Sequence, residues 1–127
     1  MKYKNVSNFI YGQFMESSSQ NFLEVISPVD GNLLSKVCLS TSKDLDDAVK
    51  AAKKAFPTWS KTSIKERVQV FYRYRNLLEK NLQSLAELCS EENGKTINES
   101  VAEIEKSIEV TGFACVLPLL IGVKFWK

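Results

Sequence analysis

The spacing of apolar residues changes near Thr41, and this change constrains the fold more than any other feature. Before Thr41, short apolar runs alternate with turn residues, and after it apolar residues recur every three or four positions. The early runs are Phe9-Ile10, Phe14, Phe22-Leu23, Val25-Ile26, Leu33-Leu34 and Val37. Because strands and helices differ in this period, we expect N-terminal β-hairpins followed by about four helices.

One hairpin turn is predicted at residues 27–32. Pro28 fixes its own φ, and Gly31 tolerates the positive φ of a tight reversal. A second reversal is expected at Gly12. The polar residues 17–21 are predicted to be a connection without a functional role.

The first two helices have clear start signals. Thr41 or Ser42 can cap the first helix, acidic residues follow in its first turns, and Pro57 is expected to end it. The second helix begins at Ser63, where Glu66 completes a capping box.

A third helical stretch ends near Gly94, which suits a left-handed cap. The fourth starts at about Thr96 and carries a stripe of Ile97, Val101, Ile104, Ile108, Thr111 and Cys115. We therefore divide the chain into a β-hairpin region (1–40), a helical region (41–118) and a divergent apolar tail (119–127). The start of the chain lacks the features of a secretory leader or transit peptide, and residues 112–123 are too short for a membrane helix.

Charge and cysteine content exclude several classes of protein. The formal charge of +2 is too small for a typical nucleic-acid-binding domain. The chain has no histidine, and Cys38, Cys89 and Cys115 are widely separated, which excludes the common zinc sites. We therefore expect the three cysteines to be reduced thiols that fill the core of a cytoplasmic protein.

Four motifs could suggest chemistry, and none is convincing. Gly94-Lys95-Thr96 is similar to the end of a phosphate-binding loop, but Cys89 stands where that loop requires glycine. Cys115 has apolar neighbours, which disfavour a reactive thiolate.

The other two motifs are groups of charged residues. The cations and aromatic residues of 61–80 scatter around a helix, so we interpret them as a solvated helix with core aromatics. We interpret the glutamates of the last helix as a solvent-facing surface; they are Glu99, Glu103, Glu105 and Glu109. We therefore predict no catalytic, cofactor-binding or metal-ligating residue in these 127 residues.

The order of the segments resembles the N-terminal region of the aldehyde dehydrogenase superfamily, and the resemblance covers most of the chain. The segments that match the superfamily are residues 9–14, 25–31, 46–59 and 91–96. Residues 108–115 and Pro118 resemble the corresponding stretch of the methylmalonate-semialdehyde dehydrogenases. Tyr11 departs from the pattern, since the family's turn usually has Asn before Gly. The resemblance fades after Pro118.

The resemblance implies an α/β fold, in which these hairpins and helices would pack against the parallel sheet of a Rossmann-like cofactor domain. Relatives oxidise aldehydes with NAD through a catalytic cysteine, and the methylmalonate-semialdehyde type transfers the acyl group to coenzyme A. The family's nucleophile, general base and cofactor loop belong to later segments. We therefore expect an N-terminal fragment that is inactive alone and binds no cofactor alone.

Two kinds of partner follow from this interpretation: a second copy, or the remainder of an aldehyde dehydrogenase. No nucleic acid or membrane is expected. The alternative is a stand-alone helical interaction module without catalysis, whose exposed apolar stripe binds a partner.

Overall fold

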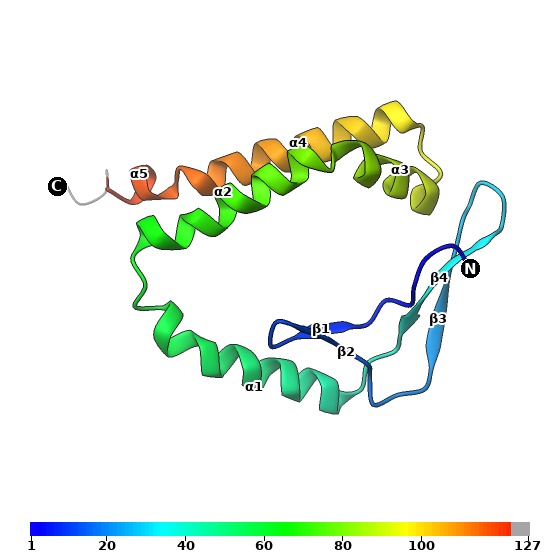
Figure 1. Ribbon diagram of the computed structural model, residues 1–127, viewed down its shortest axis with the longest axis horizontal. Helices are drawn as coiled ribbons and strands as arrows, with labels where there is room; N and C mark the ends of the chain where they lie inside the picture. The colour runs from blue at the N-terminus through cyan, green and yellow to red at the C-terminus, as the bar shows by residue number, and fades with distance from the viewer. Residues whose placement is uncertain (123–127) are drawn as a thin grey trace. The chain divides into compact units, whose positions relative to one another are not determined.

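The computed structural model describes residues 1–122, which divide into two compact units, Met1–Lys61 and a second that begins at Thr62. The described residues form two antiparallel hairpins and five helices (Figure 1). This confirms the expected α/β fragment of hairpins followed by helices, with one short helix more than the four anticipated. The division into regions 1–40, 41–118 and 119–127 remains a prediction, and residues 123–127 of the tail lie outside the described part.

The first unit begins with a hairpin of β1 (Asn8–Ile10) and β2 (Gln13–Met15). Phe9 and Phe14 are paired across it, with ring centroids 5.0 Å apart in an edge-on arrangement. Its turn is made by Tyr11 and Gly12, both at positive φ, of 60° and 76°. Positive φ at both central positions is typical of a tight hairpin turn, and it explains why Asn or Gly is favoured there.

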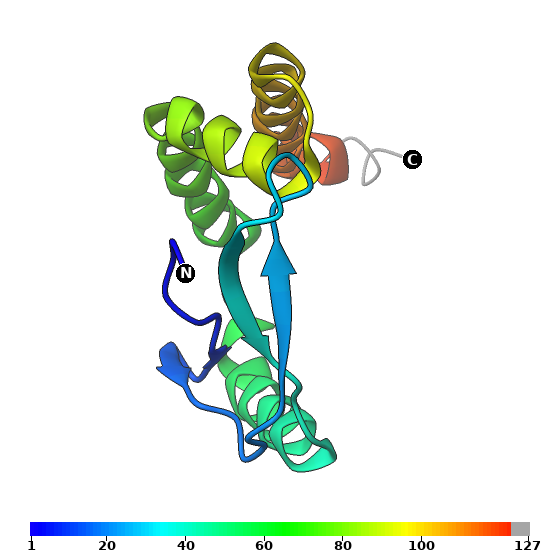
Figure 2. The same cartoon turned by 90° about the vertical axis from the view of Figure 1, so that its right-hand side faces the viewer.

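The second hairpin pairs β3 (Phe22–Ile26) with β4 (Leu33–Cys38), which lie side by side in Figure 2. The Ser27 amide donates to the Asn32 carbonyl at 2.9 Å, and Gly31 has a φ of 73°. The predicted turn at residues 27–32 is thus confirmed. A single parallel bridge joins Val6 to Val37 beside this hairpin.

Helix α1 (Ser42–Trp59) completes the first unit. Pro57 lies inside its last turn, so the expectation that Pro57 ends the helix is wrong. Proline lacks an N–H, but its fixed φ is compatible with helix, and the Ser60 amide still bonds to the Phe56 carbonyl at 2.8 Å. The loss of one hydrogen bond near the end of a helix does not stop it.

The second unit contains α2 (Ile64–Lys80), α3 (Leu82–Asn93), α4 (Ile97–Cys115) and α5 (Leu117–Gly122). Helix α4 packs against both α2 and α3. The capping boxes at Ser63/Glu66 and Thr96/Glu99 are present, and Gly94 caps α3 at a φ of 71°. Each of these helix ends was predicted.

The core of the second unit consists of small and aliphatic side chains. Its buried members are Val68, Leu78, Ala86, Ser100, Ile108, Thr111 and Cys115. The aromatic residues of α2 are not among them: Phe71, Tyr72 and Tyr74 are all exposed. The expectation of core aromatics on α2 is therefore wrong, because the residues that this helix buries are the aliphatic Val68 and Leu78.

Candidate functional site

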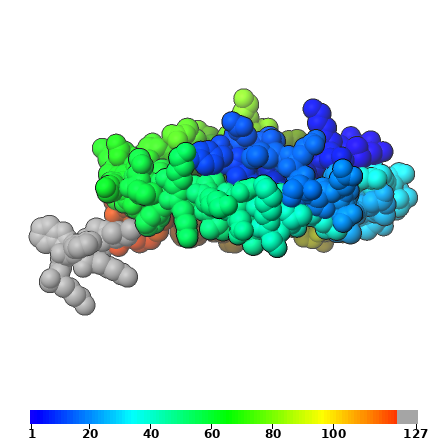
Figure 3. Space-filling model, turned by 90° about the horizontal axis from the view of Figure 1, so that it is seen from below, coloured from blue at the N-terminus to red at the C-terminus, as the bar shows by residue number. Residues whose placement is uncertain are grey.

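A hollow within the first unit lies between the β1–β2 hairpin and α1. It encloses about 540 Å³ and is lined by Phe9, Ile10, Tyr11, Gly12, Ala48, Ala51, Ala52, Lys54 and Ala55. The hairpin lies along one flank of the helix, as the space-filling view shows (Figure 3). Alanines on this flank of α1 leave room for the hairpin and for the hollow beneath it.

Lys54 is the one charged residue that lines the hollow. Its Nζ lies 5.0 Å from the centroid of the Tyr11 ring. Hydrogen bonding to the Tyr11 side chain, followed by their charge interaction, raises the pKa of Lys54. Because a raised pKa keeps the ammonium protonated, Lys54 is not suited to act as a base or nucleophile. The lining of the hollow is thus mainly apolar.

A cluster of polar groups around Asp44 fixes the N-terminus of α1. The Asp44 carboxylate accepts hydrogen bonds from the Ser17 hydroxyl at 2.6 Å, the Ser18 amide at 3.1 Å, and both the amide and hydroxyl of Thr41 at 2.7 and 2.9 Å. These hydrogen bonds hold the pKa of Asp44 well below its usual value, and the bond from Ser17 has the largest effect. Asp44 therefore links the β2–β3 connection to the helix.

The sequence analysis missed the role of this connection. The signal that was available is Asp44 three residues after Thr41, which predicts a capping box. A local pattern cannot show that Ser17 and Ser18, more than twenty residues earlier, also reach this carboxylate.

The three cysteines have different surroundings. Cys115 is buried at the end of α4, whereas Cys38 and Cys89 are only half-buried. Core filling thus describes Cys115 and is wrong for the other two. The Cys38 thiol lies 3.8 Å from the Asn8 side-chain oxygen, and the Cys89 thiol lies 3.8 Å from the Glu103 carboxylate.

Gly94-Lys95-Thr96 joins α3 to α4. Gly94 is the left-handed cap, and Thr96 caps the next helix. Lys95 donates a hydrogen bond to Glu103, which raises the pKa of Lys95 and lowers that of Glu103. Lys95 is therefore committed to an ion pair, and the expected helix cap is confirmed.

Several other charged residues of the second unit take part in a helix cap or in ion pairs. Glu99 belongs to the cap of α4, and hydrogen bonds from the Thr96 side chain and then its amide lower the pKa of Glu99. Glu109 pairs with Lys106 at 2.7 Å, and Arg75 pairs with Glu79 at 2.8 Å.

The described residues contain no cluster of three or more His, Cys, Asp or Glu side chains that could hold a metal ion. Among the helices of residues 1–122, none is both long enough and apolar enough to cross a bilayer.

Comparisons with known proteins identify the family. Residues 14–119 match the model of the aldehyde dehydrogenase family, and the chain therefore belongs to this family. Malonate-semialdehyde dehydrogenases are among its relatives: one from Lacticaseibacillus casei is 40% identical over 117 residues, and one from Geobacillus thermodenitrificans is 43% identical over 117 residues. Each match covers 92% of this chain and 24% of the relative.

Solved structures agree with this assignment. A Sinorhizobium meliloti protein described as a methylmalonate-semialdehyde dehydrogenase, complexed with NAD, has a TM-score of 0.87 and 34% identity. A benzaldehyde dehydrogenase from Corynebacterium glutamicum has a TM-score of 0.82 and 30% identity. The two structural alignments cover 94% and 87% of this chain, respectively, and each covers 24% of the solved chain. The chain thus spans about a quarter of the length of the relatives that it matches.

Proposed function

We propose that these 127 residues are the N-terminal part of an NAD-dependent aldehyde dehydrogenase that acts on malonate semialdehyde or methylmalonate semialdehyde. Coenzyme A is the proposed acyl acceptor, and the cytoplasm is the proposed location. The observation that carries the proposal is the identity of about 40% to malonate-semialdehyde dehydrogenases along 92% of the chain.

The proposed role of this region is to support the rest of the enzyme. Asp44 joins a loop to α1, Gly94 and Thr96 join α3 to α4, and the hollow beside α1 is lined mainly by apolar groups. These features support a scaffold, since none of them pairs a nucleophile with a base.

We further propose that the 127-residue polypeptide alone does not catalyse the reaction and does not bind NAD. The test is to incubate it with malonate semialdehyde, NAD and coenzyme A, to follow NADH absorbance, and to measure NAD binding by calorimetry. The L. casei relative serves as the positive control. NADH formation or saturable NAD binding by the 127 residues would show that this part of the proposal is wrong.

A second candidate function is an interaction module without catalysis. It is favoured by the exposure of large apolar side chains on α1, where Leu45 is 64% exposed and Phe56 is 66% exposed. Inactivity of the 127 residues together with a partner of fixed stoichiometry would support this candidate.

A further inference from the structure

The sequence contains one Asn-Gly pair, Asn93-Gly94, at the junction of α3 and α4. Asparagine followed by glycine is the sequence most prone to deamidation, because glycine has no side chain to hinder the approach of its backbone nitrogen to the asparagine side chain. Each of the other asparagines of the chain precedes a larger residue. Asn93 is therefore the asparagine of this sequence with the highest intrinsic reactivity.

Deamidation at this pair needs only water as a co-reactant. The backbone nitrogen of Gly94, after loss of its proton, attacks the side-chain carbonyl carbon of Asn93, and the Asn93 Nδ2 leaves as ammonia. Water then opens the resulting succinimide ring and gives aspartate or isoaspartate. The reaction therefore requires a free Gly94 amide and an Asn93 side chain that is turned toward it.

In the structure both of these groups are engaged in other hydrogen bonds. The Gly94 amide donates to the Ser90 carbonyl at 2.8 Å, and the Asn93 Nδ2 donates to the Cys89 carbonyl at 3.1 Å. The first bond holds the proton that must be lost, and the second holds the Asn93 amide against the preceding turn of α3. The cap of α3 thus opposes both requirements of the reaction.

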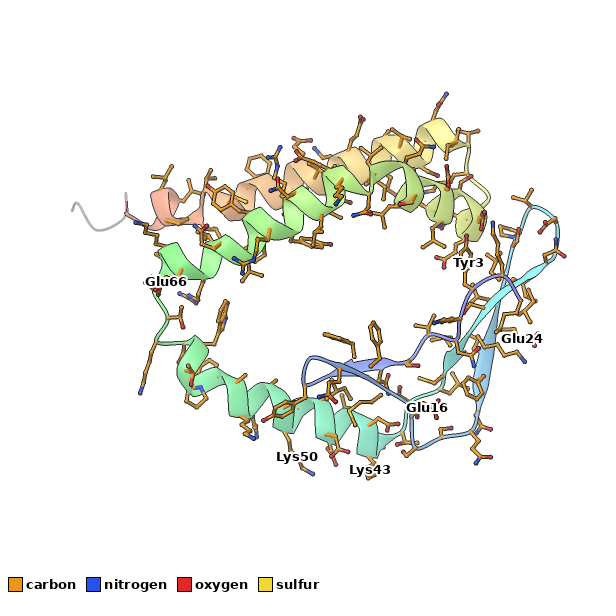
Figure 4. The ribbon with its side chains drawn as sticks, in the orientation of Figure 1. Tyr3, Glu16, Glu24, Lys43, Lys50 and Glu66 are labelled. Atoms are coloured by element: carbon orange, nitrogen blue, oxygen red, sulfur yellow. The ribbon has the colours of Figure 1, made fainter. Side chains whose placement is uncertain are left out.

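Further contacts hold the connection to the two helices. The Ser90 hydroxyl donates to the Lys95 carbonyl at 2.7 Å, and the Lys95 ammonium is bound by Glu103 of α4. The connection between α3 and α4, drawn in yellow in Figure 4, is thereby tied to both helices. All of these contacts are made among residues of α3, α4 and their connection.

We propose that Asn93 is a deamidation site that the cap of α3 keeps closed, with Ser90 as the positioning residue that holds the connection in place. Deamidation then proceeds only from the fraction of molecules in which this connection has opened, so its rate measures that fraction. The proposal does not depend on the proposed enzymatic function.

The product of the reaction opposes the cap that precedes it. An aspartate at position 93 has no Nδ2 to donate to the Cys89 carbonyl, and its negative charge lies at the C-terminal end of α3, where the helix dipole disfavours an anion. Isoaspartate also lengthens the backbone at the point where the helix ends. Deamidation is thus expected to loosen the connection irreversibly.

Peptide mapping by mass spectrometry tests the proposal on the whole chain. The chain is incubated at mildly alkaline pH, either native or unfolded in urea, and the conversion of Asn93 to aspartate and isoaspartate is followed with time. We expect conversion to be at least about tenfold slower in the native chain, because the reactive open state is a minor population.

Ser90→Ala removes the hydrogen bond to the Lys95 carbonyl. It is expected to speed conversion about fivefold in the native chain and to leave the rate in urea unchanged. Ser84→Ala is the matched control, because it removes a hydroxyl that donates to the Asn81 carbonyl at the other end of α3. It should change neither rate, and circular dichroism checks that both variants are folded.

A second pair of variants tests the effect of the product. Asn93→Asp is expected to lower the midpoint of thermal unfolding by about 2–5 °C. Asn98→Asp makes the same change in the first turn of α4, where the helix dipole favours an anion, and is expected not to lower the midpoint. A midpoint that Asn93→Asp leaves unchanged would contradict the expected loosening of the cap.

Two results would overturn the proposal. The first is conversion that is as fast in the native chain as in urea, which would show that the cap does not protect Asn93. The second is an equal effect of Ser90→Ala and Ser84→Ala on the native rate, which would show that Ser90 does not hold the connection closed.

Discussion

The Ser17 hydroxyl donates a 2.6 Å hydrogen bond to the Asp44 carboxylate, and so joins a loop to a helix that begins 25 residues later. The same carboxylate bonds to the amide and hydroxyl of Thr41, while the Thr41 hydroxyl accepts from the Asp44 amide at 3.3 Å. The start of α1 and the β2–β3 connection therefore share one polar cluster.

Removal of the Thr41 hydroxyl should destabilise the first unit. We expect Thr41→Ala to lower the free energy of unfolding by about 1 kcal/mol, because an amide at the start of α1 loses its partner. Urea unfolding followed by Trp59 fluorescence, in a Trp126→Phe background, measures the change. Ser42→Ala, one residue later and exposed, is the matched control and should change stability little. Equal effects of both substitutions would contradict the role of Thr41.

The Asp44 carboxylate should make the first unit sensitive to acid. Its pKa is lowered by folding, so its contribution to stability is fully present above the unfolded value of 3.8 and is lost as the pH falls below it. Asp44→Asn should therefore be less stable than the wild type at neutral pH, and the difference should shrink at pH values below 3.8. Unfolding curves across this range test the prediction, and a difference that is independent of pH would contradict it.

Two fully buried small residues in the second unit should respond differently to substitution. Ala86 is completely buried in α3, and we expect Ala86→Leu to cost about 1–3 kcal/mol through overpacking. Ala102→Leu, at an exposed position of α4, is the control. If the two substitutions have the same effect on thermal unfolding, Ala86 does not lie in a close-packed core.

Ser100 is also fully buried, and its hydroxyl oxygen has no hydrogen-bond partner among the described residues. We expect Ser100→Ala to raise the free energy of unfolding by about 1 kcal/mol, because an unsatisfied polar group is removed without loss of a contact. A loss of stability would show that the hydroxyl has a partner in solution. Calorimetry of the whole chain gives the sign.

The glycines of the helical unit provide a further contrast. Gly94 has a φ of 71°, and Gly94→Ala should cost about 1 kcal/mol, since an L side chain is strained in that conformation. Gly112 lies inside α4, where an added Cβ would meet only the Arg75 Nε at 3.8 Å. Gly112→Ala should therefore stabilise the chain by about 0.5–1 kcal/mol. Opposite signs in thermal unfolding are the expected result.

Local signals predicted the helix starts because a capping box involves only residues three positions apart. The capping box of Ser63 with Glu66 was found in this way, and Gly94 was recognised as a cap. The start of α4 was placed at about Thr96, but its pairing with Glu99 was not predicted. Pro57 was misjudged because its cost depends on its distance from the end of the helix.

Long-range features could not be derived from local patterns. Apolar spacing shows which residues of a helix share a side, but not which side another element covers. Val68 and Leu78 are buried whereas Tyr74 is exposed, and Leu45 and Phe56 are exposed despite their regular spacing. The Ser17 hydrogen bond to Asp44 likewise depends on the path of the chain through two hairpins.

The central claim is that this chain supplies part of a malonate-semialdehyde-type dehydrogenase, and a chimera tests it most directly. Residues 14–119 replace the corresponding segment of the G. thermodenitrificans relative, which is 43% identical. NADH formation from malonate semialdehyde is then compared with that of the unaltered relative. We predict a folded chimera whose kcat/KM is within about tenfold of the relative's, a loss of no more than ~1.4 kcal/mol in transition-state stabilisation. A folded chimera without NAD-dependent activity would contradict the account.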